Sequence, residues 1–74
     1  MTGFAKIEHS SNIDAVKYDS AVRELEIKFK NGSHYAYFGV PGDVAEGLVT
    51  AKSAGSYFSA KIRGVYKHRV LKHG

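Results

Sequence analysis

Cysteine is absent from the 74 residues of this chain, so the chain has neither the disulfide framework of small secreted domains nor the thiolate ligands of a structural zinc site. Its absence favours a reducing compartment, and we expect a cytoplasmic protein. No stretch approaches the roughly 20 apolar residues of a membrane span, and residues 1–9 have no apolar core of signal-peptide length. The sequence therefore predicts no membrane association.

Acidic residues are missing from the last part of the chain, since Glu46 is the last of them. Up to Thr50 there are five Lys and Arg against seven Asp and Glu, a balance of −2, whereas the remainder has six Lys and Arg and no acid, a balance of +6. Charge segregated in this way attracts an anionic partner to one end of a molecule. Because it identifies no reaction, we expect recognition rather than catalysis.

Proline occurs once, and the sequence has no Pro/Gly linker, internal repeat or low-complexity run. We therefore expect residues 1–74 to form a single domain, in which residues 67–74 are a basic, partly frayed tail. A chain of this length buries only about 60% of the surface that its unfolded form exposes, so it has one small core.

Alternating apolar and charged residues predict β-strands in the first half. Residues 25–29 alternate in this way, Asn31-Gly32 follows as a turn, and residues 34–38 are rich in aromatic side chains, which together predict a β-hairpin. Residues 14–18 predict a strand before the hairpin, and residues 6–9 leave a fourth strand open. The strands should form an antiparallel meander.

Two short helices are predicted after the hairpin. Pro41 suits the first turn of a helix in which Val44, Leu48 and Ala51, at i, i+4 and i+7, form an apolar stripe. Ser56 is placed to cap a second helix that weakens at Gly64. The predicted fold class is α+β: a three-stranded antiparallel meander, with a possible fourth N-terminal strand, packed against two short helices.

The orientation of Tyr35 and Tyr37 depends on the hairpin loop. If the loop is Asn31-Gly32 in a type I′ turn, the tyrosines stand outside and could stack nucleic-acid bases. If the loop also includes Lys30, as a type I turn with a glycine bulge, the tyrosines join the apolar face with Phe29. A one-residue shift in the pairing of the two strands therefore decides whether the tyrosines are exposed for binding or buried in the core. Both alternatives stay open.

The segment after the first helix is a candidate phosphate site. A glycine-containing turn before a helix presents backbone N–H groups, so the amides of Gly55 and Ser56 could seat a phosphate. An ordinary interhelical turn is the alternative.

Cationic side chains alternate with apolar ones through the rest of the chain, which predicts a phosphate-binding surface or, alternatively, a solvated face. Tyr35 and Tyr57 are candidates for base stacking. The cationic candidates are Lys52, Lys61, Arg63, Lys67 and Arg69.

Neither a catalytic constellation nor a metal site is predicted. The histidines, at positions 9, 34, 68 and 73, lack metal-ligand spacing. No serine lies in a nucleophile elbow, and no acidic pair has the context of acid/base catalysis. We expect no enzyme, no metal and no cofactor.

A series of short motifs adds a family resemblance. In chain order they are Ser10-Ser11-Asn12-Ile13, Tyr18-Asp19, Leu25-x-Ile27-x-Phe29, Tyr35-x-Tyr37, Val40-Pro41, Ser53-x-Gly55-x-Tyr57-Phe58, Ile62 and Tyr66. By their order and spacing, most of the chain resembles the KTSC domain, a short module named for the C-terminal end of some lysyl-tRNA synthetases and also found as a stand-alone small bacterial protein. Ser59 departs from the pattern, since an Asn usually follows the aromatic pair. The resemblance implies the fold and suggests RNA as a ligand. It also implies that the tyrosines are packed and not exposed, and it supplies no catalytic residue.

Two functions follow as hypotheses. In the first, the domain binds RNA or another polyanion, which requires the cations of the last part of the chain to converge on one continuous surface. In the second, it binds a protein partner through a sheet edge or the apolar side chains of the tail. The sequence leaves the oligomeric state open.

Overall fold

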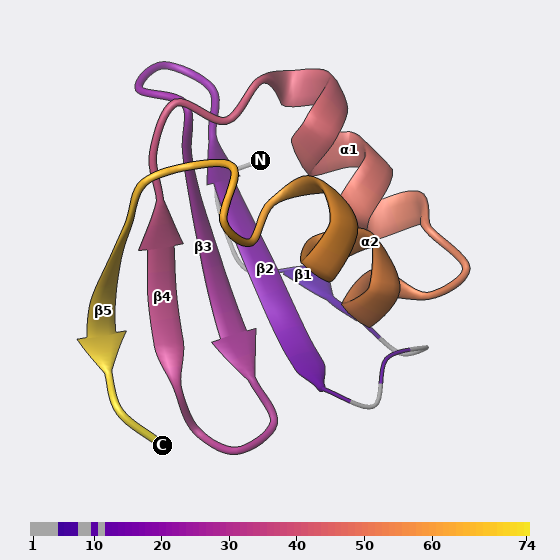
Figure 1. Ribbon diagram of the computed structural model, residues 1–74, viewed down its shortest axis with the longest axis vertical. Helices are drawn as coiled ribbons and strands as arrows, with labels where there is room; N and C mark the ends of the chain where they lie inside the picture. Colours follow the sequence, from indigo (N-terminus) through magenta and orange to yellow (C-terminus); the bar gives the residue numbers. More distant parts are fainter. Residues whose placement is uncertain (1–4, 8–9, 11) are drawn as a thin grey trace.

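The structure is a computed structural model that describes residues 5–7, 10 and 12–74. It shows an antiparallel sheet of five strands in the order β1-β2-β3-β4-β5, with both helices on one face (Figure 1). The elements are β1 (Ala5–Lys6), β2 (Ile13–Asp19), β3 (Glu24–Phe29), β4 (His34–Tyr37), α1 (Gly42–Thr50), α2 (Ala54–Lys61) and β5 (His68–Lys72). The predicted α+β class is confirmed.

The sheet extends beyond the predicted meander at both ends. β1 supplies the N-terminal strand that the sequence left open, although residues 8–9 of that prediction lie outside the described residues. β5 was not predicted: residues 67–74 were expected to be a basic, partly frayed tail, whereas His68–Lys72 form a strand that pairs with β4. The residues of β4 that pair with β5 lie 31 to 38 positions earlier in the chain, from Tyr37 with His68 to His34 with Lys72, so no local sequence pattern predicts this pairing.

The β3–β4 hairpin adopts the three-residue loop. The amide of Phe29 donates to the carbonyl of Ser33 at 2.8 Å, and the amide of Gly32 donates to the carbonyl of Phe29 at 3.0 Å. Gly32 has a φ of 94°, a conformation that glycine adopts without the strain of a side chain. The resulting register places Tyr35 and Tyr37 opposite apolar residues of β3, on the inner face of the sheet.

Both helices begin next to residues that suit a helix N-terminus. Pro41 precedes α1, whose buried side chains are Ala45 and Leu48. Ser53 caps α2, since its hydroxyl accepts a hydrogen bond from the amide of Ser56 at 3.3 Å. The prediction that Ser56 itself is the cap is therefore wrong by one helical turn.

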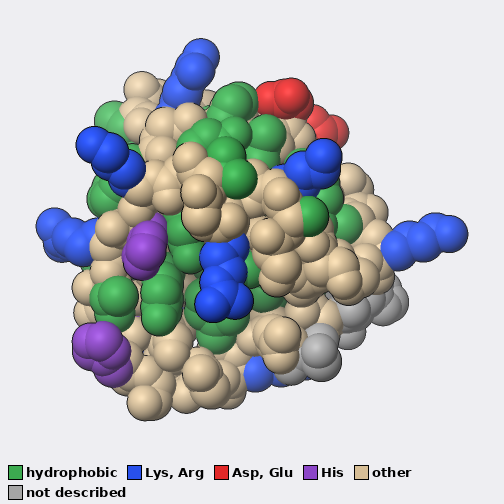
Figure 2. Space-filling model, viewed as in Figure 1, with side chains coloured by type: hydrophobic (Ala, Val, Ile, Leu, Met, Phe, Trp, Pro, Cys, Tyr) green, Lys and Arg blue, Asp and Glu red, His purple; other side chains and the backbone are tan. Residues whose placement is uncertain are grey.

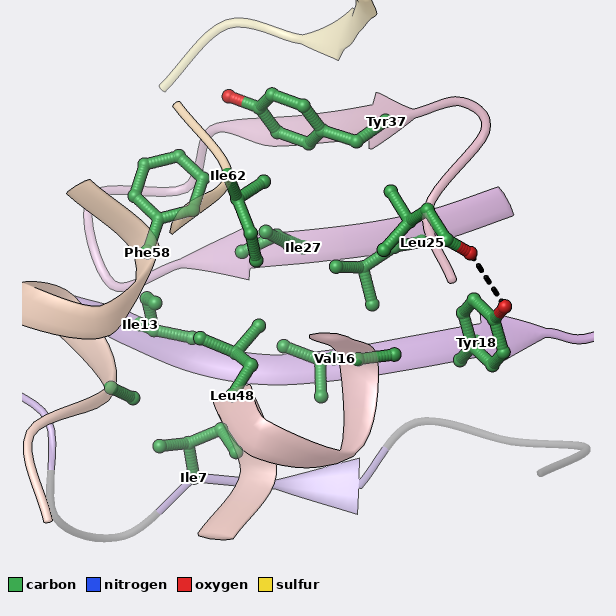
Figure 3. Packing of buried hydrophobic residues seen from close by; sticks show 13 residues of the cluster. Ile7, Ile13, Val16, Tyr18, Leu25, Ile27, Tyr37, Leu48, Phe58 and Ile62 are labelled. Atoms are coloured by element: carbon green, nitrogen blue, oxygen red, sulfur yellow. Dashed lines mark hydrogen bonds between the residues drawn. The ribbon is translucent and has the colours of Figure 1, made fainter. Parts of the chain in front are cut away.

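The core lies between the helices and the inner face of the sheet (Figure 3). Its largest fully buried side chains are Ile13, Val16, Leu25, Ile27, Val40, Leu48 and Ile62. Burying one such side chain stabilises a fold by about 1.5–3 kcal/mol. The ring of Tyr18 closes one end of the core, where its hydroxyl donates to the carbonyl of Val40 at 2.6 Å.

The helices leave part of the inner face of the sheet uncovered. In Figure 1 they lie on the side of the sheet that holds β1 and β2, while β5 stands clear of them at the opposite edge. The segment that follows α2 crosses the sheet to reach β5. Consequently Tyr35 is only partly buried and His68 is exposed.

Candidate nucleic-acid interface

A hollow of about 390 Å³ lies over the uncovered part of the inner face. It is lined by Phe29, Asn31, Ser33, Tyr35, Tyr37, Phe58, Arg63, Gly64 and His68. An adjoining hollow of about 300 Å³ shares four of these residues and reaches toward the start of α2. Figure 2 shows hydrophobic side chains exposed in the middle of this face, with Lys or Arg side chains beside and around them.

Aromatic rings form the floor of this hollow. The rings of Tyr35 and Tyr37 are stacked, with centroids 6.4 Å apart and planes 14° apart. His68 stacks with Tyr35 at 5.6 Å and with Tyr37 at 5.2 Å. Phe29 meets Tyr35 edge-on at 5.5 Å, and Phe58 meets Tyr37 in the same way at 5.5 Å. These offset and edge-to-face contacts fix the rings in place from several sides.

Arg63 supplies positive charge beside the aromatic floor. Burial raises the pKa of the Tyr37 phenol, the neighbouring Tyr35 acts in the same direction, and the charge of Arg63 acts against both. The guanidinium therefore lies close enough to the phenol to affect its ionisation. At neutral pH Tyr37 keeps its proton, so the hydroxyl and Arg63 are both hydrogen-bond donors in the hollow.

The cations of the last part of the chain, all of which the structure describes, do not share one face of the sheet. Arg63 lines the hollow on the helix side of the sheet. Arg69 pairs with Ala36, so it lies on the opposite, outer face, and Lys72 has the same orientation through its pairing with His34. Figure 2 shows Lys and Arg side chains distributed around the rim of the visible face.

The remaining predicted cations lie away from the hollow. Lys52 is in the connection between α1 and α2, Lys61 is the last residue of α2, and Lys67 directly precedes β5. All three are exposed, and none belongs to the residues described above as lining the hollow.

The backbone amides of Gly55 and Ser56 are not both available to bind a phosphate. The amide of Ser56 already donates to Ser53, whose hydroxyl also lies 3.1 Å from the hydroxyl of Ser56. Gly55 lines the adjoining hollow and packs near the side chains of Asn12 and Ser10. The capping bond therefore occupies one of the two amides on which the prediction depended.

Tyr57 packs against α1. Its hydroxyl donates to the carbonyl of Val44 at 3.0 Å, and its ring lies directly against Gly47 of α1. A Cβ at Gly47 would overlap the phenol, so glycine is what allows the two helices to approach. Of the two predicted stacking residues, the hollow contains Tyr35 alone.

The sequence pattern pointed to Tyr37 together with Tyr35, but it did not indicate the contributions of His68, Phe29 and Phe58 to this site. Both helices lie between β4 and His68 in the sequence. The position of His68 beside Tyr35 therefore results from the pairing of β5 with β4. The usable signal was the alternation in residues 68–70, where His68 and Val70 share one face and Arg69 takes the other.

No group of three His, Cys, Asp or Glu within residues 5–7, 10 and 12–74 is arranged to hold a metal ion. His9, one of the histidines considered above, lies outside those residues. None of the helices in the described part of the chain has the length and apolarity needed to cross a membrane.

The family model described as the KTSC domain matches residues 9–66. The chain belongs to the KTSC domain family. A crystal structure of a KTSC domain protein from Yersinia pestis is similar throughout, with a TM-score of 0.87 and 32% identity over 95% of this chain and 97% of that one. The predicted resemblance is thereby confirmed.

Curated relatives place KTSC segments in two settings. Lysine–tRNA ligases from a Nostoc species and from Trichormus variabilis are each 41% identical over 61 residues, which is 82% of this chain. The chain spans only 11% of the length of these ligases. A protein from Tsukamurella paurometabola is 37% identical over 60 residues, which is 81% of this chain and 84% of that protein. The KTSC domain therefore occurs both within a large synthetase and in a protein of similar size to this one.

The first motif of this KTSC domain has a structural explanation. Ser10 is buried, and its hydroxyl accepts hydrogen bonds from the amides of Asn12 at 3.2 Å and Ile13 at 2.9 Å. The serine therefore fixes the turn that leads into β2. Ser11 of the same motif lies outside the described residues.

Proposed function

We propose that this KTSC domain is a non-catalytic module that binds single-stranded RNA in the hollow between α2 and β5. The observation that carries the proposal is the stacked array of Tyr35, His68 and Tyr37, which is open on one side and has Arg63 beside it. Unstacked bases bind to such rings because every base has a π-face. Duplex nucleic acid hides its base faces and would not use this floor.

Charge has a smaller role here than the sequence suggested. Arg63 is placed to contact a bound nucleotide, while the cations around the rim raise the local concentration of an anionic strand. The related segments belong to enzymes named lysine–tRNA ligases, which is consistent with an RNA ligand. The absence of cysteine supports a cytoplasmic setting.

A matched pair of charge reversals tests the site. Arg63→Glu changes the hollow, whereas Arg69→Glu makes the same change of charge on the outer face of the sheet. We expect fluorescence anisotropy with a short mixed-sequence RNA to show a large loss of affinity for the first variant and a small loss for the second. Equal losses would mean that general charge attraction, and not the hollow, causes binding.

The aromatic floor is tested separately with Tyr35→Ala. Removing one stacking ring should weaken binding by roughly 5- to 150-fold, which corresponds to 1–3 kcal/mol per stacked base. Each phosphate contact should contribute about −0.7 to the slope of log affinity against log salt concentration. An affinity that Tyr35→Ala leaves unchanged would contradict the proposal.

The position of β5 favours a second candidate function, the binding of a protein partner. β5 is the last strand in the order of the sheet, no described strand pairs with its far side, and Leu71 within it is 38% exposed. An extended peptide could add to this edge through backbone hydrogen bonds. A peptide bound in this way should tolerate Arg63→Glu but not Leu71→Pro, which removes a backbone donor from β5.

A further inference from the structure

One tyrosine hydroxyl at the floor of the hollow is not used by the fold. The hydroxyls of Tyr18 and Tyr57 each donate to a backbone carbonyl, at 2.6 and 3.0 Å. Tyr37 is only 3% exposed, yet its hydroxyl has no hydrogen-bond partner among the described residues. Figure 3 shows this hydroxyl directed away from Leu25, beyond the side chains of Ile62 and Phe58. Because Tyr37 lines the hollow and no described side chain or backbone group uses its hydroxyl, the hydroxyl can donate a hydrogen bond to a ligand there.

The surroundings of this hydroxyl restrict what the ligand can be. Tyr35 and His68 offer ring faces, which suit a planar ring. Arg63 offers a fork of N–H donors and no acceptor, and it lines the same hollow as Tyr37. A planar ring with two adjacent acceptors on one edge satisfies both requirements.

Among the RNA bases, guanine and cytosine have such an edge, and guanine fits this hollow better because its two-ring system covers more of an aromatic floor than the single ring of cytosine. The carbonyl oxygen of guanine and its adjacent ring nitrogen are both acceptors, and an arginine contacts them in the commonest specific pairing with this base. Adenine places an amino donor beside its ring nitrogens, and the carbonyls of uracil flank an N–H donor, so neither has two adjacent acceptors. Cytosine has an acceptor pair only on the edge of its smaller ring, next to its amino donor.

We propose that the hollow selects an unpaired guanine, which stacks on Tyr35 and His68 and accepts hydrogen bonds from Arg63 and Tyr37. This inference rests on the proposed function and adds the identity of the base. It makes Arg63 and Tyr37 the residues that determine specificity, whereas Tyr35 and His68 provide stacking for any base.

The test uses four short oligoadenylates that carry guanine, uracil, cytosine or adenine at one central position, titrated against the intact protein at one salt concentration. We expect the guanine oligonucleotide to bind tightest, by roughly 5- to 150-fold over the others. Tyr37→Phe keeps the ring, so it should reduce the preference while weaker, base-independent binding remains. Tyr18→Phe removes a hydroxyl elsewhere in the core and is the matched control, which should keep the preference.

Arg63→Lys provides a second test because it keeps the charge and loses the fork. We expect the guanine preference to fall while the salt dependence stays. Equal binding of all four oligonucleotides, or a preference for another base, would overturn the guanine inference and leave RNA binding intact. Failure of all four to bind would overturn both. Thermal unfolding of each variant checks that a lost preference is not a lost fold.

Discussion

The two faces of the central sheet use different chemistry although the same strands build both. The inner face carries the apolar core and the aromatic hollow, whereas the outer face carries the Lys17–Glu26 ion pair and a contact between Glu26 and His34. At its centre the carboxylate of Glu26 lies 3.4 Å from the amine of Lys17 and 3.2 Å from Nε2 of His34. Successive residues of a strand point to opposite faces of the sheet. The cations of one stretch of sequence are therefore divided between the two faces.

An excess of positive charge along a stretch of sequence does not predict where the positive charge lies on the folded surface. In β5, His68 and Arg69 are adjacent in the chain and lie on opposite faces. The outer face also gathers cations from the first half, among them Lys17 and Lys28, which pair with residues on the neighbouring strands. Position within a pleated strand therefore decides where a charge lies.

The largest expected difference is between neighbours on β3. Ile27 is fully buried on the inner face, so Ile27→Ala should lower the free energy of unfolding by about 2–5 kcal/mol, through lost apolar contact and a residual cavity. Lys28 is exposed on the outer face, and Lys28→Ala should change that free energy by about 0.5 kcal/mol or less. Urea denaturation of both variants measures the difference. Similar losses of unfolding free energy would mean that side chains of the outer face stabilise the protein as much as those of the core.

A smaller effect is expected in the helix layer that covers the inner face. Gly47→Ala places a Cβ against the Tyr57 phenol, and we expect it to destabilise the protein by about 1–3 kcal/mol, although alanine favours helix more than glycine. Gly42→Ala is the matched control on the same helix, since its Cβ would meet Tyr18 at an ordinary 3.9 Å. In thermal unfolding, Gly47→Ala should have a lower melting temperature than the unmodified protein. The melting temperature of Gly42→Ala should equal or exceed that of the unmodified protein.

A still smaller effect is expected from the outer ion pairs. Lys17 is 39% and Glu26 18% exposed, and pairs of this kind contribute about 0.2–1 kcal/mol, less at high salt. Glu26→Gln should therefore lower stability slightly at low salt and hardly at all at high salt. Denaturation curves at two salt concentrations test this, and a large, salt-independent loss would show that Glu26 has a structural role that ion pairing does not explain.

The smallest difference at neutral pH should come from the Tyr37 phenol, which is protonated in both folded and unfolded chains. Because burial raises its folded pKa, the unfolded chain releases this proton first as the pH rises past about 10. The stabilising contribution of the neutral phenol is present below that pH and declines above it, so Tyr37→Phe should flatten the alkaline loss of stability. Denaturation between neutral and strongly alkaline pH measures this, and identical alkaline curves would contradict it.

Much of the fold could be predicted because its signals are local. The alternation in residues 25–29, the turn at Asn31-Gly32 and the helix start after Pro41 each depend on neighbours within a few residues. The candidate site was harder to predict. Arg63 and Tyr35 were identified, but the stacking partner His68 was not, since its place beside them depends on a strand pairing across both helices.

The amino-acid sequence by itself determined the α+β class, the central meander, the family and the excess of positive charge. Only the tertiary structure decided the register of the tyrosines, the strand formed by residues 68–72 and the division of the cations between two faces. The physical reason is the period of two in a β-strand. It makes the side of every residue depend on a register, and that register is fixed by hydrogen bonds to distant strands and by the burial of one face.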